Sequence, residues 1–405
     1  MAFHILDEGA RCLQCKNAPC KASCPIATDV PEMVRLFNDK KLNEAGQLLF
    51  ENNPMSLVCS LVCHHDGQCE GSCVLAKKSS AVHISSIEHY ISDWYFDKMK
   101  IEMAPKLNKR VAVIGSGPAG ITISFILAQM GYDITIFDAK DKIGGVLQYG
   151  IPGFRLPKSV LERYRKKLLE MGVKIRPNAT IGGALEIDDL FRDGYLSIFI
   201  GTGVWRPKTL GVRGESLGHV HFAIDYLANP NAFDLGENLA IIGMGNAAMD
   251  VARTAIRNGV QKCTLYGIEQ KPAANPSEVS YAKLDGAEFE YNMEIQEILP
   301  EGPVFEQVLR DEEGNAIGTS EEKVLKPADS IIISISQMPK NKIANTTDGL
   351  KIKESGLLFT DSEGKTTVPG IFGAGDVVHG AKTVVEAVAY SKKVAQAMHE
   401  YMQAL

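Results

Sequence analysis

The sequence lacks the features that direct a chain into a membrane, out of the cell or onto a nucleic acid. Its 405 residues contain no apolar run that approaches the roughly 18 residues needed to cross a bilayer. The N-terminal stretch MAFHILDEGARC has neither the basic segment nor the apolar segment of a secretory signal. The net charge is -6, and Lys and Arg are spread along the chain without forming a basic stripe. We therefore expect a cytoplasmic protein that binds neither nucleic acid nor membrane.

Most of the chain also has very little cysteine. Eight of the nine cysteines lie in the first 73 residues, and the ninth, Cys263, sits in the apolar run CTLY, where we expect an inert core thiol. Residues beyond 105 contain no Cys-x-x-Cys, so disulfide reductase activity is not expected. No paired acid and base and no Ser-His-Asp arrangement is found for substrate chemistry. Clustered cysteines in a reducing cytosol instead favour a metal or redox group near the N-terminus.

The N-terminal cysteines fall into two groups with regular spacing. RCLQCKNAPCKASCP has the pattern C-x2-C-x4-C-x3-C-P, and CSLVC through CEGSC has the pattern C-x3-C-x5-C-x3-C; the groups are Cys12, Cys15, Cys20, Cys24 and Cys59, Cys63, Cys69, Cys73. The first pattern parallels that of bacterial ferredoxins with a longer middle gap, and there the cysteine before proline binds the other cluster. Two four-iron clusters with interleaved ligands therefore fit better than two zinc sites, which are the alternative.

The sequence pattern changes near residue 105 and predicts an α/β protein. Residues 1–105 have helical periodicity and should form a helical domain around the two clusters. A strand, glycine turn, helix and strand then follow at KRVAVIGSGPAGITISFILAQMGYDITIFDA and again at ENLAIIGMGNAAMDVARTAIRNGVQKCTLYG, as is typical of Rossmann-like dinucleotide-binding domains. The C-terminal tail reads as a strand and a helix that complete the first of them. We expect the first domain in residues 106–225 and 345–405, and the second, inserted in it, in residues 226–344.

The first nucleotide fingerprint is GxGxxG directly after the strand VAVI. Gly115 permits the tight turn, Gly117 lets the backbone approach a pyrophosphate, and Gly120 allows the helix to pack on the strand. Asp138 ends the next strand, where an acid is needed for the ribose hydroxyls. This combination predicts a dinucleotide site.

The second fingerprint has Gly243, Gly245 and Ala248 after LAII, which is the G/A variant. A 2′-phosphate is usually bound by arginine, but the stretch LYGIEQKPAANPSE offers Glu269 and only Lys271. An acid there would bind ribose hydroxyls and repel a phosphate. We therefore expect NAD(H) in this site, with NADP(H) less favoured.

Two dinucleotide sites in one chain suggest FAD together with a nicotinamide cofactor, and the tail favours FAD in the first site. In GIFGAGDVV, Asp376 lies on a turn where its carboxylate could hold the ribityl hydroxyls; a helix N-cap is the alternative role. The helix that begins near Thr383 would then point its positive N-terminus at the pyrimidine end of the flavin.

The whole chain resembles the small (β) subunit of glutamate synthase and its relatives. These include the NADH-accepting subunit of bacterial dihydropyrimidine dehydrogenase and the large subunit of the electron-bifurcating ferredoxin:NADP transhydrogenase. The motifs that carry the resemblance are the two cysteine groups, GSGPAG, GGVLQYGIPGFRLPK, GMGNAAMD and GAGDVVHGAKTVVEA.

The resemblance implies ligands for each cofactor. One cluster would be held by Cys12, Cys15, Cys20 and Cys73, and the other by Cys24, Cys63, Cys69 and, in VHISSIEHYI, Glu88; simple counting would choose Cys59 as the last ligand. The motif residues expected to contact FAD are Gly115, Gly117, Pro118, Ala119, Gly120, Asp138, Gly145, Leu147, Gln148, Arg155, Gly375, Asp376, Thr383 and Val384. Those expected to contact NAD(H) are Gly243, Gly245, Asn246, Ala247, Ala248 and Glu269.

Two departures from the relatives bear on these expectations. Gly267 and Ile268 stand where the NADP-using relatives carry paired basic residues, which favours NAD. Ser336 stands in SISQMP where many relatives have glycine.

The expected function is electron transfer between NAD(H) and a partner protein, a catalytic or electron-accepting subunit, through FAD and the two clusters. Hydride transfer asks little of side chains because the cofactors carry it. Two alternatives are open: a bifurcating flavoprotein subunit, and a structural relay subunit whose nicotinamide site is vestigial.

Overall fold

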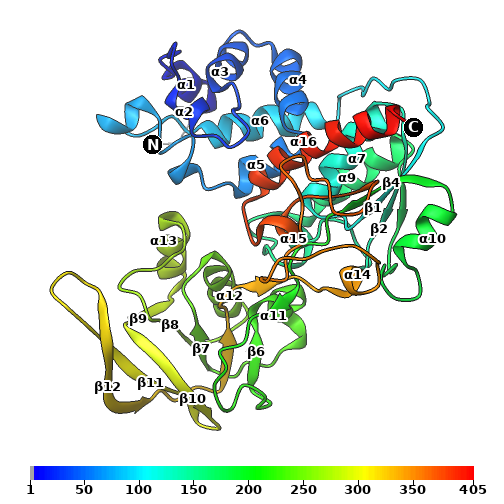
Figure 1. Ribbon diagram of the computed structural model, residues 1–405. Helices are drawn as coiled ribbons and strands as arrows, with labels where there is room; N and C mark the ends of the chain where they lie inside the picture. The colour runs from blue at the N-terminus through cyan, green and yellow to red at the C-terminus, as the bar shows by residue number, and fades with distance from the viewer. Residues whose placement is uncertain (1–3) are drawn as a thin grey trace. The chain divides into compact units, whose positions relative to one another are not determined.

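The computed structural model describes residues 4–405, and its N-terminal part is helical (Figure 1). The helices are α1 (Ile5–Ala10), α2 (Pro19–Ala22), α3 (Val30–Asn38), α4 (Leu42–Asn52), α5 (Ser56–Val62) and α6 (Ile84–Phe96), with 3-10 turns at His65–Gly67 and Val74–Lys77. Helix α3 shows how they form. Asp29 caps it by accepting a hydrogen bond from the Glu32 N–H, and Met33, Val34 and Phe37 on one face are buried. Within residues 4–405, no helix is both long and apolar enough to cross a membrane.

A parallel sheet follows, and the C-terminal tail completes it. Its strands are β1 (Arg110–Ile114), β2 (Asp133–Phe137), β3 (Lys174–Arg176), β4 (Tyr195–Ile200) and β15 (Ile371–Gly373), in the order β15-β4-β1-β2-β3. Strand β15 pairs with β4, with Ile371 opposite Ile198. The helices are α7 (Pro118–Gln129), α8 (Val146–Tyr149), α9 (Lys158–Glu170), α10 (Ile187–Arg192), α14 (Lys342–Asn345), α15 (Asp376–His379) and α16 (Val384–Gln403). The predicted return of the tail to the first Rossmann-like domain is confirmed.

The inserted domain has a parallel sheet of its own. Its strands are β6 (Val220–Phe222), β7 (Asn238–Ile242), β8 (Lys262–Gly267), β9 (Glu288–Tyr291) and β13 (Ser330–Ile333), in the order β6-β13-β7-β8-β9. Its helices are α11 (Ala223–Ala228), α12 (Asn246–Arg257) and α13 (Pro276–Asp285), with a 3-10 turn at Pro230–Ala232. Cys263 on β8 is 1 % exposed within the apolar core, the environment expected for it.

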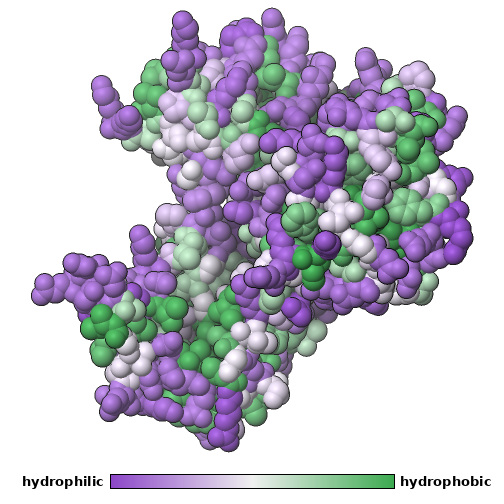
Figure 2. All heavy atoms as spheres, viewed as in Figure 1, coloured by the Kyte–Doolittle hydropathy of each residue, from purple (hydrophilic) through white to green (hydrophobic). Residues whose placement is uncertain are grey.

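An antiparallel sheet that the sequence did not predict is built between β9 and β13. It consists of β10 (Met293–Leu299), β11 (Gly302–Arg310) and β12 (Ala316–Leu325), in chain order. Figure 2 shows apolar residues, in green, on the visible face of this part of the molecule. The large apolar side chains that are exposed in this sheet are Leu309, Ile317, Val324 and Leu325. The strand β12 is mostly exposed, which explains why its sequence carries little apolar alternation.

The chain divides into two compact units. Unit 1 comprises the residues up to Gln148, Gly153–Val204 and Met338–Leu405, and unit 2 comprises Tyr149–Pro152 and Trp205–Gln337. The short strands β5 (Arg206–Pro207) and β14 (Gln337–Met338) lie where the chain passes between them. These limits differ from the expected 226 and 344. Strand β6 pairs with β13 and so belongs to the inserted sheet, whereas Ile343 of α14 packs in the core of the first sheet.

The helical domain packs directly against the first Rossmann-like domain within unit 1. The Phe50 and Phe125 rings are 5.6 Å apart edge to face, and the buried Tyr164 hydroxyl donates to the Pro54 carbonyl at 3.0 Å. Lys392 of α16 donates to the backbone oxygen of Asn52 at 2.5 Å.

Candidate functional site: two glycine turns and two cysteine groups

The first glycine turn joins β1 to α7. Gly117 precedes α7 with an extended backbone (φ -69°, ψ -174°), and a Cβ built there meets no atom of the described residues within 4 Å. Gly115 has φ +95°, and its Cβ would lie 2.5 Å from the Gly201 oxygen; that of Gly120 would lie 2.0 Å from the Gly115 oxygen. Gly115 and Gly120 are therefore required by the fold itself, whereas Gly117 leaves room for a pyrophosphate at the helix N-terminus.

Asp138 lies directly after β2 and beside this turn. It is 9 % exposed, and its Oδ2 accepts hydrogen bonds from the Ser116 N–H at 2.7 Å and from the Ser116 hydroxyl. Its Oδ1 accepts from the Lys140 N–H at 2.8 Å. An ionised carboxylate has about four lone-pair sites, so Asp138 keeps acceptor capacity for a ribose hydroxyl.

Other residues expected to bind FAD converge on the same turn from distant parts of unit 1. A Cβ on Gly145 would lie 2.9 Å from the Gly117 Cα, and one on Gly375 would lie 3.1 Å from the Ala119 Cβ. The remaining expected residues are buried (Leu147) or half-buried (Pro118, Gln148, Arg155, Thr383 and Val384). The tail thus brings its Gly-Asp turn to the start of α7, as the sequence suggested.

Asp376 is the first residue of α15 and follows Gly375, whose φ is +77°. Its Oδ1 accepts a hydrogen bond from the Lys382 N–H at 3.2 Å. Burial raises the pKa of Asp376 to about 6; the bond from Lys382 opposes this rise and the charge of Glu386 adds to it. Helix α16 begins at Val384, where Thr383 and Glu386 form a capping box. Asp376 is therefore a half-buried carboxylate that accepts a hydrogen bond from the chain, and it is suited to accept hydrogen bonds from a ligand's hydroxyls.

We expect Asp376→Asn to stabilise the FAD-free protein above about pH 6. The folded-state pKa of about 6 lies above the ordinary value of 3.8, so ionisation costs folding stability as the pH rises between these two values. The neutral variant should gain roughly 3 kcal/mol over the wild type at pH 7.5 and little at pH 4. Urea denaturation at both pH values measures this, and Asp348→Asn on the surface is the control. A constant difference at both pH values would contradict the expected result.

The second glycine turn, in unit 2, repeats the first. Gly245 precedes α12 with φ -83° and ψ 177°, and a Cβ there again meets no described atom within 4 Å. Gly243 has φ +118°, and its Cβ would lie 2.3 Å from the Ser334 oxygen. Ala248 is buried and Ala247 is half-buried on the first turn of α12. The same open position is thus available for a second pyrophosphate.

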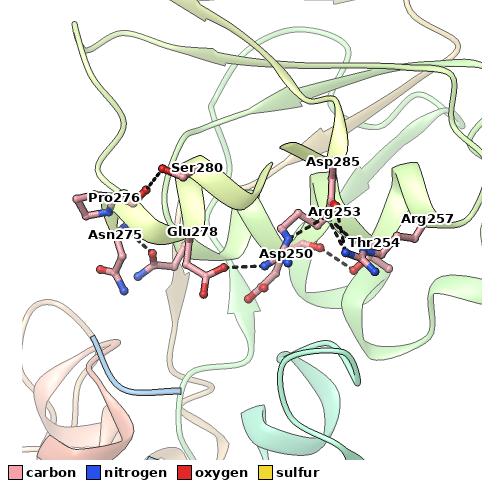
Figure 3. Close-up of polar contacts among 10 residues, drawn as sticks. Asp250, Arg253, Thr254, Arg257, Asn275, Pro276, Glu278, Ser280 and Asp285 are labelled. Atoms are coloured by element: carbon pink, nitrogen blue, oxygen red, sulfur yellow. Dashed lines mark hydrogen bonds and ion pairs between the residues drawn. The ribbon is translucent and has the colours of Figure 1, made fainter. Parts of the chain in front are cut away.

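An ion-pair network holds α13 on α12 next to this turn (Figure 3). Arg253, 8 % exposed, donates to Glu278 at 3.0 Å and to Asp285 at 3.1 Å. The Asn275 N–H donates to the Asn246 Oδ1 at 2.8 Å. The loop between β8 and α13 is therefore fixed at its far end to the first residue of α12.

The near end of the same loop carries Glu269, which is 69 % exposed at its side chain. Lys271, the cation that the sequence offered, is exposed. Sequence reasoning missed a second cation, Arg310 at the end of β11, whose guanidinium lies 3.7 Å from the Glu269 carboxylate. The tight turn DEEGN after β11 was the only local signal that this strand folds back.

In the helical domain Cys12 lies within electrostatic range of Cys15, Cys20 and Cys73, and Cys20 lies within range of Cys73. Burial raises the pKa of Cys12, and Cys15 and Cys73 add to the rise. Burial also raises the pKa of Cys20 to about 11, with contributions from Cys12 and Cys73. The four thiols are half-buried. The structure thus gathers the first expected ligand set and leaves Cys24 out of it.

A second group surrounds a pocket next to α16. The thiol and carboxyl groups that line it are Cys24, Cys59, Cys63, Cys69 and Glu88, together with Asn53, His65 and Val385. A hydrogen bond with Cys59 and burial raise the pKa of Cys63, and burial followed by the charge of Glu88 raises that of Cys69. Burial and then the charge of Glu70 raise the pKa of Glu88 to about 8. Both candidates for the last ligand, Glu88 and Cys59, line this pocket.

The chemistry of these donor sets suits iron–sulfur ligation. Thiolates are the usual ligands of such clusters. Burial raises the pKa of several of these thiols and of the Glu88 carboxyl group, so a bound positive centre is needed to ionise them near neutral pH. The Nε2 atoms of His64 and His65 are buried beside the second group without a hydrogen-bond partner in the described part of the chain. Among residues 4–405, no three His, Cys, Asp or Glu side chains lie close enough to share a single metal ion.

Two family models match the chain. Residues 2–100 match the dihydropyrimidine dehydrogenase domain II, 4Fe-4S cluster family. Residues 109–391 match the pyridine nucleotide-disulphide oxidoreductase family. The boundary between the two models lies where the sequence pattern changes near residue 105.

Curated relatives match almost the whole chain. The glutamate synthase [NADPH] small chain of Azospirillum brasilense is 31 % identical, over 98 % of this chain and 89 % of that one. The glutamate synthase [NADPH] small chain of Escherichia coli is 30 % identical over 98 % and 91 %. The NAD-dependent dihydropyrimidine dehydrogenase subunit PreT of Salmonella typhimurium is 31 % identical over 98 % and 94 %. These relatives are named for both NADPH and NAD.

Solved structures share the fold. Mycobacterium tuberculosis FprA in complex with NADPH is 15 % identical, with a TM-score of 0.61 over 73 % of this chain and 85 % of that one. The thioredoxin reductase of T. acidophilum is 21 % identical, with a TM-score of 0.56 over 73 % and 99 %. Both likenesses support the Rossmann-type architecture and no more than that.

Proposed function

Because this chain belongs to the family of flavin and iron–sulfur oxidoreductases that includes the glutamate synthase small chain and the dihydropyrimidine dehydrogenase subunit PreT, we propose that it passes electrons between NADH and a partner protein through FAD and two four-iron clusters. FAD, when bound, supplies the conversion between two-electron hydride transfer and single-electron transfer. The chain's own residues bind and orient the cofactors and exclude water from them.

The observation that carries the proposal is the path of α16. Its first turn, with Thr383 and Val384, lies among the residues expected to bind FAD, and Val385 in the same turn lines the pocket of the second cysteine group. Val385 is 2 % exposed. One helix turn therefore borders both proposed cofactor positions, and a short, dry separation of this kind supports the proposed electron transfer between them.

Anchoring contacts keep that turn in place against the helical domain. Lys392, two turns further along α16, donates to the backbone oxygen of Asn52 at 2.5 Å and to its side-chain oxygen at 3.3 Å. The next residue, Asn53, lines the same pocket and accepts a hydrogen bond from the Met55 N–H at 2.9 Å. We assign Cys12, Cys15, Cys20 and Cys73 to one cluster, and Cys24, Cys63, Cys69 and Glu88 to the other.

Anaerobic titration with NADH tests the proposal. The purified protein should be brown, hold about eight irons per chain, and lose its flavin absorbance on addition of about one NADH per FAD. A colourless protein that contains zinc would overturn the cluster assignment. A brown protein whose flavin NADH leaves oxidised would favour the relay with a vestigial nicotinamide site.

The final acceptor is proposed to reside on another chain, since no acid-base pair for substrate chemistry is found in this sequence. The relatives named above are subunits or chains of larger enzymes by their names. Purification of the native protein together with its companion, followed by identification of that companion, would name the catalytic subunit. A native protein that purifies alone and reduces a small molecule directly would contradict this proposal.

A further inference from the structure

The ribose end of the nicotinamide site contains a fixed positive charge that the sequence pattern does not reveal. In a Rossmann fold the residues just after the second strand meet the adenosine ribose, and here these are Ile268 and Glu269 after β8. An acid at this place binds the 2′- and 3′-hydroxyls and repels a 2′-phosphate. The inference rests on the proposed function, because it concerns the same nicotinamide site.

Arg310 reaches this place from the end of β11 and is held there by oxygen acceptors. Its Nη2 donates to the Ile268 carbonyl at 2.5 Å, its Nε to the Asn292 Oδ1 at 2.8 Å, and its Nη1 to the Gly314 carbonyl at 2.9 Å. The side chain is 14 % exposed. A guanidinium held at three of its N–H groups cannot turn away without losing these bonds.

The hairpin turn that supports Arg310 is itself well fixed. Asp311 Oδ1 accepts from the Glu313 N–H at 3.0 Å and from the Asn315 N–H at 2.8 Å. These bonds set the direction of the Gly314 carbonyl, which in turn accepts from Arg310. The position of the charge is therefore built by β11 and the following turn and does not depend on Glu269.

Glu269, unlike Arg310, is largely exposed to solvent. Its side chain is 69 % exposed, and its Oε2 lies 3.7 Å from the Arg310 Nη2, which is within ion-pair range but too long for a hydrogen bond. The carboxylate therefore remains available to a ribose, while it screens the charge of the guanidinium behind it.

We propose that Arg310 is a specificity-determining residue and that the Glu269–Arg310 pair, not Glu269 alone, discriminates a ribose 2′-hydroxyl from a 2′-phosphate. With both charges present the site is nearly neutral and the hydroxyl pair binds Glu269. Without the Glu269 charge, the anchored guanidinium attracts a phosphate. The sequence pattern shows only Glu269 and Lys271 at this place, and so does not predict that Arg310 could attract a phosphate.

Binding of two fragments that lack nicotinamide tests the pair without electron transfer. ADP-ribose and 2′-phospho-ADP-ribose are titrated calorimetrically into the FAD-loaded protein. Wild type should prefer ADP-ribose, and Glu269→Gln should tighten binding of the phosphorylated fragment by about tenfold or more, the effect of removing one like charge near the site. Glu288→Gln is the matched control, because it removes the same charge at the amino end of the neighbouring strand β9 and should leave both affinities unchanged.

Arg310→Met in the Glu269→Gln background should abolish the gain, whereas a merely structural role would weaken both fragments alike. If that variant does not fold, the gain in Glu269→Gln must still shrink as salt rises from about 0.05 to 0.5 M, since it is a charge effect. An unchanged fragment preference in Glu269→Gln, or a gain that survives Arg310→Met, overturns the inference alone. Failure of wild type to bind either fragment overturns the inference together with the proposed nicotinamide site.

Discussion

Replacing Glu88 with Ala will leave about four irons per chain where the wild type holds about eight. The matched substitution Cys59→Ala will leave the iron content unchanged. Both residues line the same pocket, so the two variants remove side chains from one site. Iron analysis of anaerobically purified protein, together with its visible spectrum, measures the result.

The physical reason is the difference between burying a carboxyl group and burying a thiol. Glu88 is 8 % exposed in the middle of α6, and burial raises its pKa to about 8. A buried carboxylate without a positive partner is unfavourable by several kcal/mol, whereas a free cysteine packs as a small apolar side chain. A glutamate at this position therefore needs a function more than Cys59 does, and ligation of iron supplies one.

The reverse pattern of iron loss would identify Cys59 as the ligand. If Cys59→Ala loses half the iron and Glu88→Ala keeps all of it, the ligand set predicted by counting cysteines is correct and the assignment of Glu88 is wrong. In that case the burial of Glu88 would have to be explained by the electrostatics of the pocket alone. Equal losses in both variants would mean that the pocket tolerates no change, and Glu88→Gln, which retains an oxygen ligand, would then separate ligation from packing.

The glycine turns, the strands and the returning tail could be predicted because their signals are local. In each fingerprint the strand, the turn and the helix lie within about thirty residues, and only glycine fits Gly115 or Gly243. Ser336 illustrates the limit of such reasoning. The resemblance implied glycine at this position in many relatives, and the Ser336 φ of +82° is a backbone conformation that glycine favours.

What the sequence could not predict depends on tertiary contacts. Arg310 and Glu269 meet only because the β10–β12 sheet folds back onto the loop after β8, and β12 of this sheet is too exposed to show a clear apolar pattern. The last ligand of the second cluster could not be predicted from cysteine spacing for a related reason. Spacing predicts which residues are near in the chain, whereas the pocket brings both Cys59 and Glu88 to the same place.

Gly117→Ala and Gly245→Ala will each remove one nucleotide while leaving the protein folded. Both glycines precede their helices with extended backbone that alanine adopts, and a Cβ on either meets no described atom within 4 Å. The added methyl group occupies space that a pyrophosphate needs, so affinity for the ligand should fall by at least about tenfold, or 1.4 kcal/mol. The unfolding free energy of the FAD-free protein should stay unchanged or rise by about 0.4–1 kcal/mol.

The two variants should separate the two sites. Gly117→Ala should lower the FAD retained on purification without changing ADP-ribose binding to the remaining holoprotein, and Gly245→Ala should do the reverse. Gly120→Ala is the control for steric damage, since its Cβ would lie 2.0 Å from the Gly115 oxygen and should destabilise the protein itself by about 1–3 kcal/mol. FAD retention in Gly117→Ala equal to that of the wild type would show that the flavin's pyrophosphate does not approach this turn, because the variant changes nothing else there.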